Sequence, residues 1–192
     1  MSDPKQMKTL YSAEPESLFA YLRQVWKYRS MILLLATRDL SIKYAQTLLG
    51  LVWTIIQPLT GLLIFTFFFS MVIALPGLPE SGYAIFAFTG MTGWYFFSFI
   101  VSQSSTSVLT GQELTKKIFF PNIILPLSKV LVGLVDLGIS MALLAILMLV
   151  KGIYPGWQII LLPLFVLANI LVGLSVGLWL CALTVRYRDL QH

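Results

Sequence analysis

The chain has 192 residues, of which 58% are hydrophobic and 11% are charged, and its formal net charge is +5. This composition excludes a soluble globular domain, in which about a quarter of the residues are charged and form the polar surface. Lys and Arg lie almost wholly outside the apolar stretches, so the positive charge reflects membrane topology. We therefore expect lipid around most of the chain and no nucleic-acid partner.

Residues 1–50 form the predicted cytoplasmic N-terminal segment. Apolar residues recur at helical spacing from Leu18 to Leu40, with Arg23, Lys27 and Arg38 on other faces. Basic residues together with a tryptophan are typical of a helix that lies along the membrane surface. The pattern predicts an amphipathic interface helix over 18–40 in contact with membrane lipid, and it leaves a plain solvated helix as the alternative.

Four apolar stretches are long enough to cross a bilayer, which takes about 20 helical residues. None of them shows the alternation of a membrane β-strand. We predict an all-α integral membrane protein with an N-terminal amphipathic interface helix and four transmembrane helices. The transmembrane domain covers 51–184, and its predicted spans are 51–75, 83–109, 123–150 and 157–184.

Positive charge predicts the orientation of these spans. Residues 1–50, the segment 111–122 and the tail 185–192 carry most of the Lys and Arg, whereas the turn 76–82 has none. By the positive-inside rule both termini are cytoplasmic. Because the chain stops within a few residues of the fourth span, we expect a truncated chain; a complete four-helix membrane protein is the alternative.

The second span is unusually polar for a lipid-facing helix. Its aromatic and hydroxyl side chains predict a conduit wall, where hydroxyls hydrogen-bond and rings stack on a sugar-like solute. Packing of small residues together with an interfacial aromatic belt is the alternative, and it explains the same pattern slightly better. The predicted lining residues are Trp94, Tyr95, Ser98, Ser102 and Ser105.

The third and fourth spans carry further polar and small residues. Asp136 is costly in lipid and should therefore face a bundle interior or water, either as a satisfied structural group or as a proton relay. Lys129 lies two turns earlier on the same face, so we expect a link between the two through water or a third group. Gly173 and Gly177 predict close helix approach in the fourth span.

The chemistry of an enzyme is missing from the sequence. No glycine-rich loop followed by Lys and Ser or Thr occurs, and the single histidine is His192. Cys181 is the single cysteine, and no set of residues has the spacing of metal ligands or of a hydrolase triad. We predict no catalytic residues, no metal and no cofactor, and a mechanical or conductive function.

Three segments together resemble a known family. They are IKYAQTLLGLVWTIIQPL at 42–59, KKIFFPNIILPLSKVLVGLVDLGIS at 116–140 and VRYRDL at 185–190. The chain is similar to permease subunits of ABC-2 type exporters, most of all to those that export O-antigen, capsular polysaccharide or teichoic acid. The resemblance implies six spans, a homodimer, a separate cytoplasmic ATPase subunit, a lipid-linked glycan as substrate, and the bacterial inner (plasma) membrane.

The resemblance also implies roles for particular residues. Residues 111–122 match the cytoplasmic coupling helix, which sits in a cleft on the ATPase; its contacts would be Glu113, Lys116, Lys117, Ile118, Phe119 and Phe120. The end of the interface helix, where the ATPase and the lipid headgroup approach, matches Arg38, Asp39, Lys43 and Tyr44. The alternatives are a non-transporting four-helix scaffold and an ABC-2 exporter of small lipids or drugs.

Overall fold

The structure is a computed structural model that describes residues 18–45, 52, 55–61, 63–64, 67, 80–111 and 120–186. All regular structure within these ranges is helical, which confirms the predicted all-α class. Three helical segments in the described part are long and apolar enough to cross a membrane: Ile85–Val108, Ile124–Lys151 and Trp157–Leu183. The predicted first span, 51–75, lies largely outside the described residues.

The three described spans fall where the apolar runs predicted them. Helix α4 covers Glu80–Thr110 and α6 covers Ile124–Lys151. The fourth predicted span begins with a 3₁₀ turn, η2, at Trp157–Leu161 and continues as α7, Leu162–Arg186. Pro163 stands in the first turn of α7, where the missing N–H of proline costs no helical hydrogen bond.

Helix α6 ends at a glycine. Gly152 has φ +65° and ψ +23°, a left-handed conformation that glycine adopts without steric cost. The N–H of Gly152 donates to the Leu149 carbonyl, and the N–H of Ile153 donates to the Met148 carbonyl. These two bonds satisfy carbonyls at the helix end and turn the chain toward η2.

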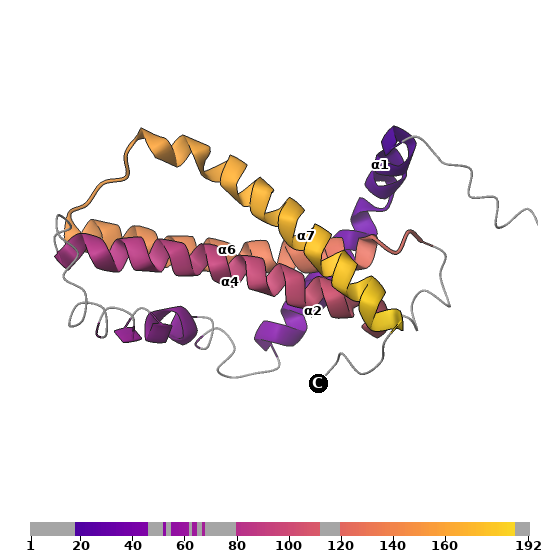
Figure 1. Ribbon diagram of the computed structural model, residues 1–192, viewed down its shortest axis with the longest axis horizontal. Coiled ribbons are helices and arrows are strands. Elements are labelled where there is room, and N and C mark those ends of the chain that lie inside the picture. Colours follow the sequence, from indigo (N-terminus) through magenta and orange to yellow (C-terminus); the bar gives the residue numbers. More distant parts are fainter. Residues whose placement is uncertain are drawn as a thin grey trace, which may run out of the picture.

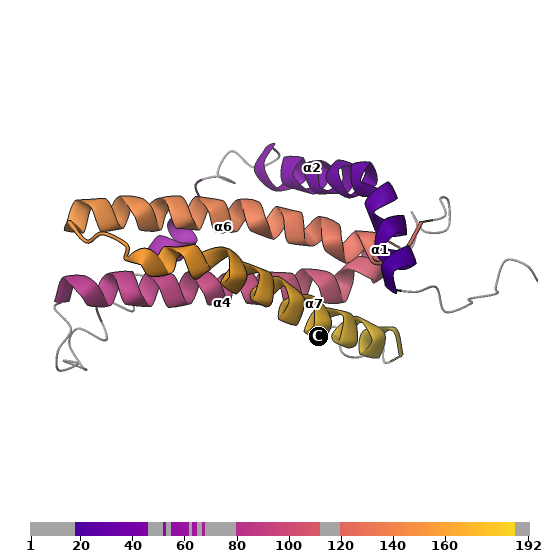
Figure 2. The ribbon, with the colours of Figure 1, turned by 90° about the horizontal axis from the view of Figure 1, so that it is seen from above.

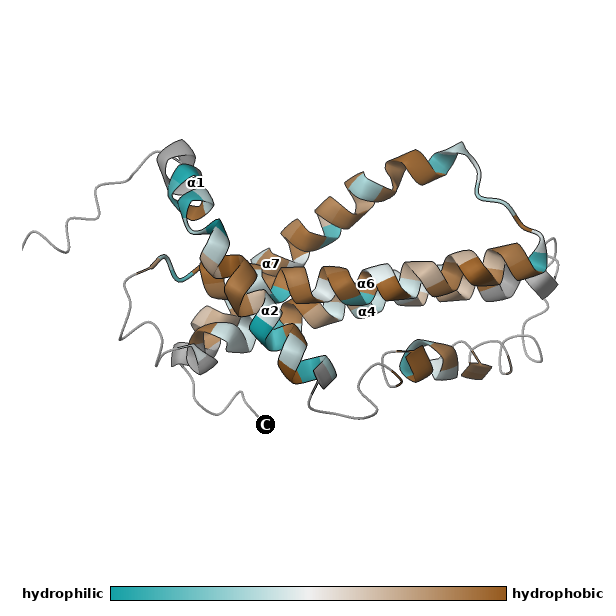
Figure 3. Ribbon diagram, turned by 180° about the vertical axis from the view of Figure 1, so that it is seen from behind, coloured by the Kyte–Doolittle hydropathy of each residue, from teal (hydrophilic) through white to brown (hydrophobic). Residues whose placement is uncertain are grey.

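Helices α4 and α6 form the centre of the molecule. They lie side by side and antiparallel, and α7 crosses α4 obliquely (Figures 1 and 2). At its N-terminal end α7 diverges from both (Figure 1). Hydrophobic residues dominate α6 and α7, and hydrophilic residues are frequent in α1, Leu18–Lys27 (Figure 3). This distribution is that of a bundle with lipid-facing spans and a polar N-terminal element.

The predicted interface helix over 18–40 is two helices in the structure. Helix α1 ends at Lys27, and α2 covers Arg29–Ala45. The chain bends at Tyr28, whose N–H donates to the Val25 carbonyl in a tightened turn (Figure 2). The bend follows from tertiary packing: Tyr28 and neighbouring residues of α2 contact a buried cluster of Leu35, Phe120, Ile124 and Leu125.

Glycines set the distance between the spans. A Cβ at Gly177 would lie 2.7 Å from the Ser104 Cβ and 3.2 Å from the Val101 carbonyl oxygen, and a Cβ at Gly173 would lie 2.9 Å from Ile100. The predicted close approach of the fourth span is therefore confirmed, and its partner is α4. Gly133 plays the same role between α6 and Phe99 of α4.

We predict that Gly177→Leu destabilises the bundle, because the backbone carbonyl of Val101 cannot move aside as a flexible side chain would. Overpacking of this kind costs about 1–3 kcal/mol. Gly138→Leu is the matched control, because a Cβ at Gly138 has no neighbour within 4 Å. Thermal unfolding of the purified variants followed by circular dichroism measures both effects. Equal destabilisation by the two substitutions would contradict the close approach of α7 to α4 at Gly177.

Candidate functional site

Two ion pairs join α2 to α6. Lys129 Nζ donates to Asp39 Oδ2 at 2.7 Å, and Lys43 Nζ donates to Asp136 Oδ2 at 2.5 Å. Tyr44 Oη donates to the other carboxylate oxygen of Asp136, also at 2.5 Å. We call these five residues the α2–α6 clamp. Each of its two carboxylates accepts hydrogen bonds on both oxygens, counting the Arg38 contact to Asp39.

Within the clamp, Lys129 and Asp136 each bind a residue of α2. Seven residues of helix separate the two by about 10 Å, too far for a direct contact, while α2 supplies a nearer partner for each. Their link through water or a third group stays a prediction. Both carboxylate oxygens of Asp136 accept hydrogen bonds, and the choice between a structural group and a proton relay stays open.

Arg38 and Asp39 lie at the edge of the clamp. Burial by itself would raise the pKa of Asp39, but hydrogen bonds from Lys129 and Arg38, together with their positive charges, hold the pKa below its ordinary value of 3.8. The Arg38 side chain is half exposed and contacts Asp39 at 2.9 Å. The four predicted interface residues thus all lie on α2, and the clamp contains Asp39, Lys43 and Tyr44.

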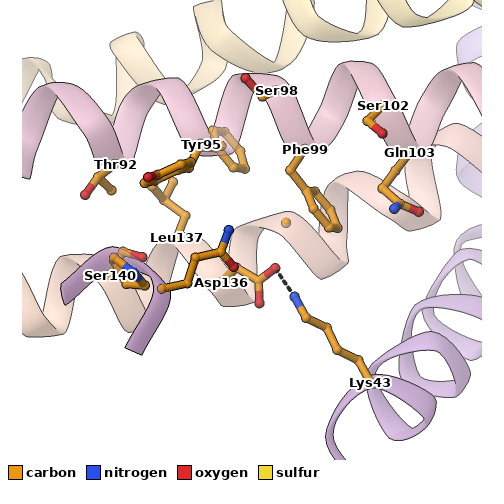
Figure 4. A pocket seen from close by; sticks show the side chains of 14 residues that line it. Lys43, Thr92, Tyr95, Ser98, Phe99, Ser102, Gln103, Asp136, Leu137 and Ser140 are labelled. Carbon is orange, nitrogen blue, oxygen red and sulfur yellow. Dashed lines mark hydrogen bonds and ion pairs between the residues drawn. The ribbon is translucent and has the colours of Figure 1, made fainter. Parts of the chain in front are cut away.

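A cavity of about 500 Å³ lies beside the clamp, among α2, α4, α6 and the helical residues 55–61. Figure 4 shows Lys43 of α2 and Asp136 of α6 on one side of the cavity and several side chains of α4 on the other. Most of the residues that line the cavity are polar, aromatic or small, and Leu137 is aliphatic. The lining consists of Lys43, Gln57, Pro58, Thr92, Tyr95, Phe96, Ser98, Phe99, Ser102, Gln103, Gly133, Asp136, Leu137 and Ser140.

The structure brings three of the five predicted conduit residues to this cavity, namely Tyr95, Ser98 and Ser102. The Trp94 side chain is 65% exposed and lies outside it, 5.9 Å from the ring of Phe97. Ser105 donates to the Ser102 carbonyl and does not line the cavity. The role of these five residues as a conduit wall stays a prediction.

Sequence analysis missed much of the lining. Phe99, Gln103 and Ser140 contribute to it, and Lys43 and Asp136 meet there across 93 positions of sequence. Thr92 and Phe99 lie three residues before and four residues after Tyr95, and Gln103 lies four residues after Phe99. The helical periodicity of the second span therefore contains a signal for them. No local sequence pattern predicts the ion pair between Lys43 and Asp136.

The predicted coupling residues are described only in part. Glu113, Lys116, Lys117, Ile118 and Phe119 lie outside the described residues. Phe120 is buried within the chain, at 5% exposure, and it contacts the α2 cluster around Leu35. The end of the predicted coupling segment is therefore packed against α2 at the point where α6 begins.

Metal ligands do not gather in the helices that the structure describes: no group of three or more His, Cys, Asp or Glu side chains is close enough to hold an ion there. The fold and the cavity together define an all-α, multi-pass membrane protein with a polar and aromatic cavity among apolar helices.

Comparison with known proteins shows which membrane proteins the chain is similar to. No family model matches the chain. The chain is 30% identical over 173 residues to the O-antigen export system permease protein RfbA of Myxococcus xanthus, covering 89% of this chain and 65% of that protein. Two Klebsiella pneumoniae proteins of the same name are 25% and 24% identical over 166 residues, covering 84% of this chain and 62% of each.

These similarities confirm the resemblance to polysaccharide-export permeases over most of the chain. The chain spans somewhat less than two thirds of the length of the relatives that it matches.

We predict that Asp136→Asn destabilises the protein by about 1–3 kcal/mol, because it removes the negative charge opposite the Lys43 ammonium. The effect stays below that of a fully buried pair because both side chains are partly accessible. The double variant Lys43→Met/Asp136→Asn should recover part of the loss. Chemical unfolding of the single and double variants measures the coupling, and strict additivity would contradict it. Arg38→Met, which removes an exposed pair, is the control.

The lowered pKa of Asp39 predicts a pH dependence. A carboxyl whose pKa is depressed by folding stabilises the folded state fully above its ordinary pKa, and this contribution is lost as the pH falls through the folded-state value. The difference in unfolding free energy between the wild type and Asp39→Asn should therefore be constant near neutral pH and shrink only below pH 3.8. Unfolding curves of both proteins along a descending pH series test this. A difference that does not vary with pH would contradict it.

Proposed function

We propose that the chain is the membrane-spanning permease subunit of an ATP-driven ABC exporter, which moves a lipid-linked polysaccharide outward across the bacterial inner membrane. The observation that carries the proposal is the cavity, where hydroxyl, amide and aromatic side chains gather among apolar helices. The named activity of the relatives supports it.

The cavity suits a glycan for a physical reason. Sugar hydroxyls lose their water on entering a membrane and need hydrogen-bonding partners there. Ser102 and Gln103 offer such partners, and the ring of Tyr95 offers a surface for the apolar face of a sugar ring. Contacts of this kind tolerate variation along a polymer, which suits the passage of a long repetitive chain.

The energy comes from a separate ATPase subunit in this proposal, because the 192 residues contain no phosphate-binding loop. The segment 111–122 would dock on that subunit from the cytoplasmic side. Its last part is well placed to transmit movement, since Phe120 packs against α2 where α6 begins. The clamp then links α2 to Asp136 at the cavity.

The remaining parts of the proposal follow from the resemblance and from the charge distribution. Both termini lie in the cytoplasm, where most of the Lys and Arg are found. Two copies of the permease form the conduit, and α2 meets the headgroup of the lipid carrier near Arg38.

We predict that Lys116→Glu/Lys117→Glu abolishes the coupling, because charge reversal opposes the contacts that the two lysines make with the ATPase. In cells that produce the protein, surface glycan should fall at least about tenfold, and the ATPase should no longer co-purify. Lys5→Glu/Lys8→Glu reverses the same number of charges elsewhere in the cytoplasmic segment and serves as the control.

Membrane levels of both double variants are compared by immunoblot, so that a loss of protein is separated from a loss of coupling. Unchanged surface glycan in the Lys116→Glu/Lys117→Glu cells would refute the proposed coupling. If no ATPase co-purifies with the wild type either, a non-transporting scaffold is the better description.

A further inference from the structure

We infer that the cavity beside the α2–α6 clamp is a binding site for uncharged sugar units and that it rejects acidic ones. The inference rests on the proposed function for the identity of the ligand as a glycan. It deepens that proposal by assigning a substrate class to one cavity within a single copy of the chain. Three properties of the cavity carry it: polar groups without protein partners, a balanced pair of charges, and one accessible aromatic ring.

The first property concerns the polar side chains of α4. Many hydroxyls of the bundle donate to carbonyls of their own helix, as Thr89, Thr92 and Ser175 do. Within the described part of the chain, no hydrogen bond is recorded for the side chains of Ser102 and Gln103. Polar groups in a membrane interior need partners, and a hydroxyl-rich ligand or water supplies them at this site.

The size of the cavity fits such a ligand. A volume of about 500 Å³ lies within the range of sites that hold small molecules, about 300–1,000 Å³. Asp136 accepts one hydrogen bond on each carboxylate oxygen, from Lys43 and Tyr44. A carboxylate has about four acceptor positions, so Asp136 retains capacity to accept from a sugar hydroxyl.

The second property is charge. Among the described residues that line the cavity, Lys43 and Asp136 are the two that carry charge, and they neutralise each other at 2.5 Å. Lys43 is held further by the face of Phe99, with Nζ 5.2 Å from the ring centroid. A uronic acid would bring a second negative charge beside Asp136 into a medium of low dielectric constant, with its cation already engaged. A neutral sugar carries no such penalty.

The third property is the position of Tyr95. Its side chain is 38% exposed, it lines the cavity, and Figure 4 shows it on the side of α4 that faces Ser140 and Leu137 of α6. Phe99 is engaged by Lys43 and Phe96 is buried, so Tyr95 is the ring left for stacking on a sugar among the described residues of the lining. Trp94, its neighbour, is more exposed and lies outside the cavity.

The test is equilibrium dialysis of the 192-residue chain in lipid nanodiscs against two radiolabelled trisaccharides, maltotriose, which is neutral, and trigalacturonate, which is acidic. We expect saturable binding of maltotriose, at least about tenfold tighter than that of trigalacturonate. Tyr95→Ala should weaken maltotriose binding at least about fivefold through loss of the stacking surface. Trp94→Ala, the matched aromatic control, should leave it unchanged.

Charge variants test the specificity directly. Asp136→Asn leaves the positive charge of Lys43 in the cavity and should shift the preference toward trigalacturonate. Lys43→Met/Asp136→Asn removes both charges and should keep the preference for maltotriose. If Asp136→Asn fails to fold, Ser102→Lys adds a positive charge to the cavity with the clamp intact, and the same shift is expected.

Three results would overturn the inference: no saturable binding of maltotriose, equal affinities for the two trisaccharides, or equal losses from Trp94→Ala and Tyr95→Ala. The dialysis needs neither ATP nor a partner subunit. Absence of binding together with intact glycan export therefore refutes only the site, whereas binding without any glycan export in cells refutes only the proposed function.

Discussion

The pairing of charges between α2 and α6 is the constraint on which the rest of the structure depends. Along α2 a negative residue, Asp39, is followed by a positive one, Lys43; along α6 the order is reversed, Lys129 and then Asp136. If α2 ran in the opposite direction, like charges would meet in both places. In a medium of low dielectric constant that arrangement is costly, so the two pairs select one direction and one register.

The position of α2 in turn creates the cavity. Lys43 and Asp136 meet beneath the side of α4 that carries Tyr95, Phe99 and Gln103 (Figure 4). On another side of α4, Ile100 packs against Gly173 and Ser104 packs against Gly177 of α7. Helix α4 is therefore packed tightly against α6 and α7 and separated from α2 by a polar space.

The sequence allowed some of this to be predicted and not the rest. The bounds of α4, α6 and α7 follow from the length of apolar runs, because lipid imposes that length wherever a helix crosses it. The bend at Tyr28 had no such signal, since neither Gly nor Pro occurs there, and packing on Phe120 determines it. The partner of Asp136 was equally hidden, because it lies 93 positions away on α2, outside the apolar runs.

Sequence analysis left two explanations for the serines of the second span, a conduit wall and helix packing. The structure shows close packing on one side of the helix and a cavity on another. Ser104 is fully buried against the position of Gly177, where a larger side chain would separate α4 from α7. Ser98 and Ser102 line the cavity instead. A helix that must pack closely on one side and offer hydroxyls on another needs small polar residues on both, since serine is small enough for the first role and polar enough for the second. Composition alone therefore cannot separate the two roles, whereas the neighbour on each side does.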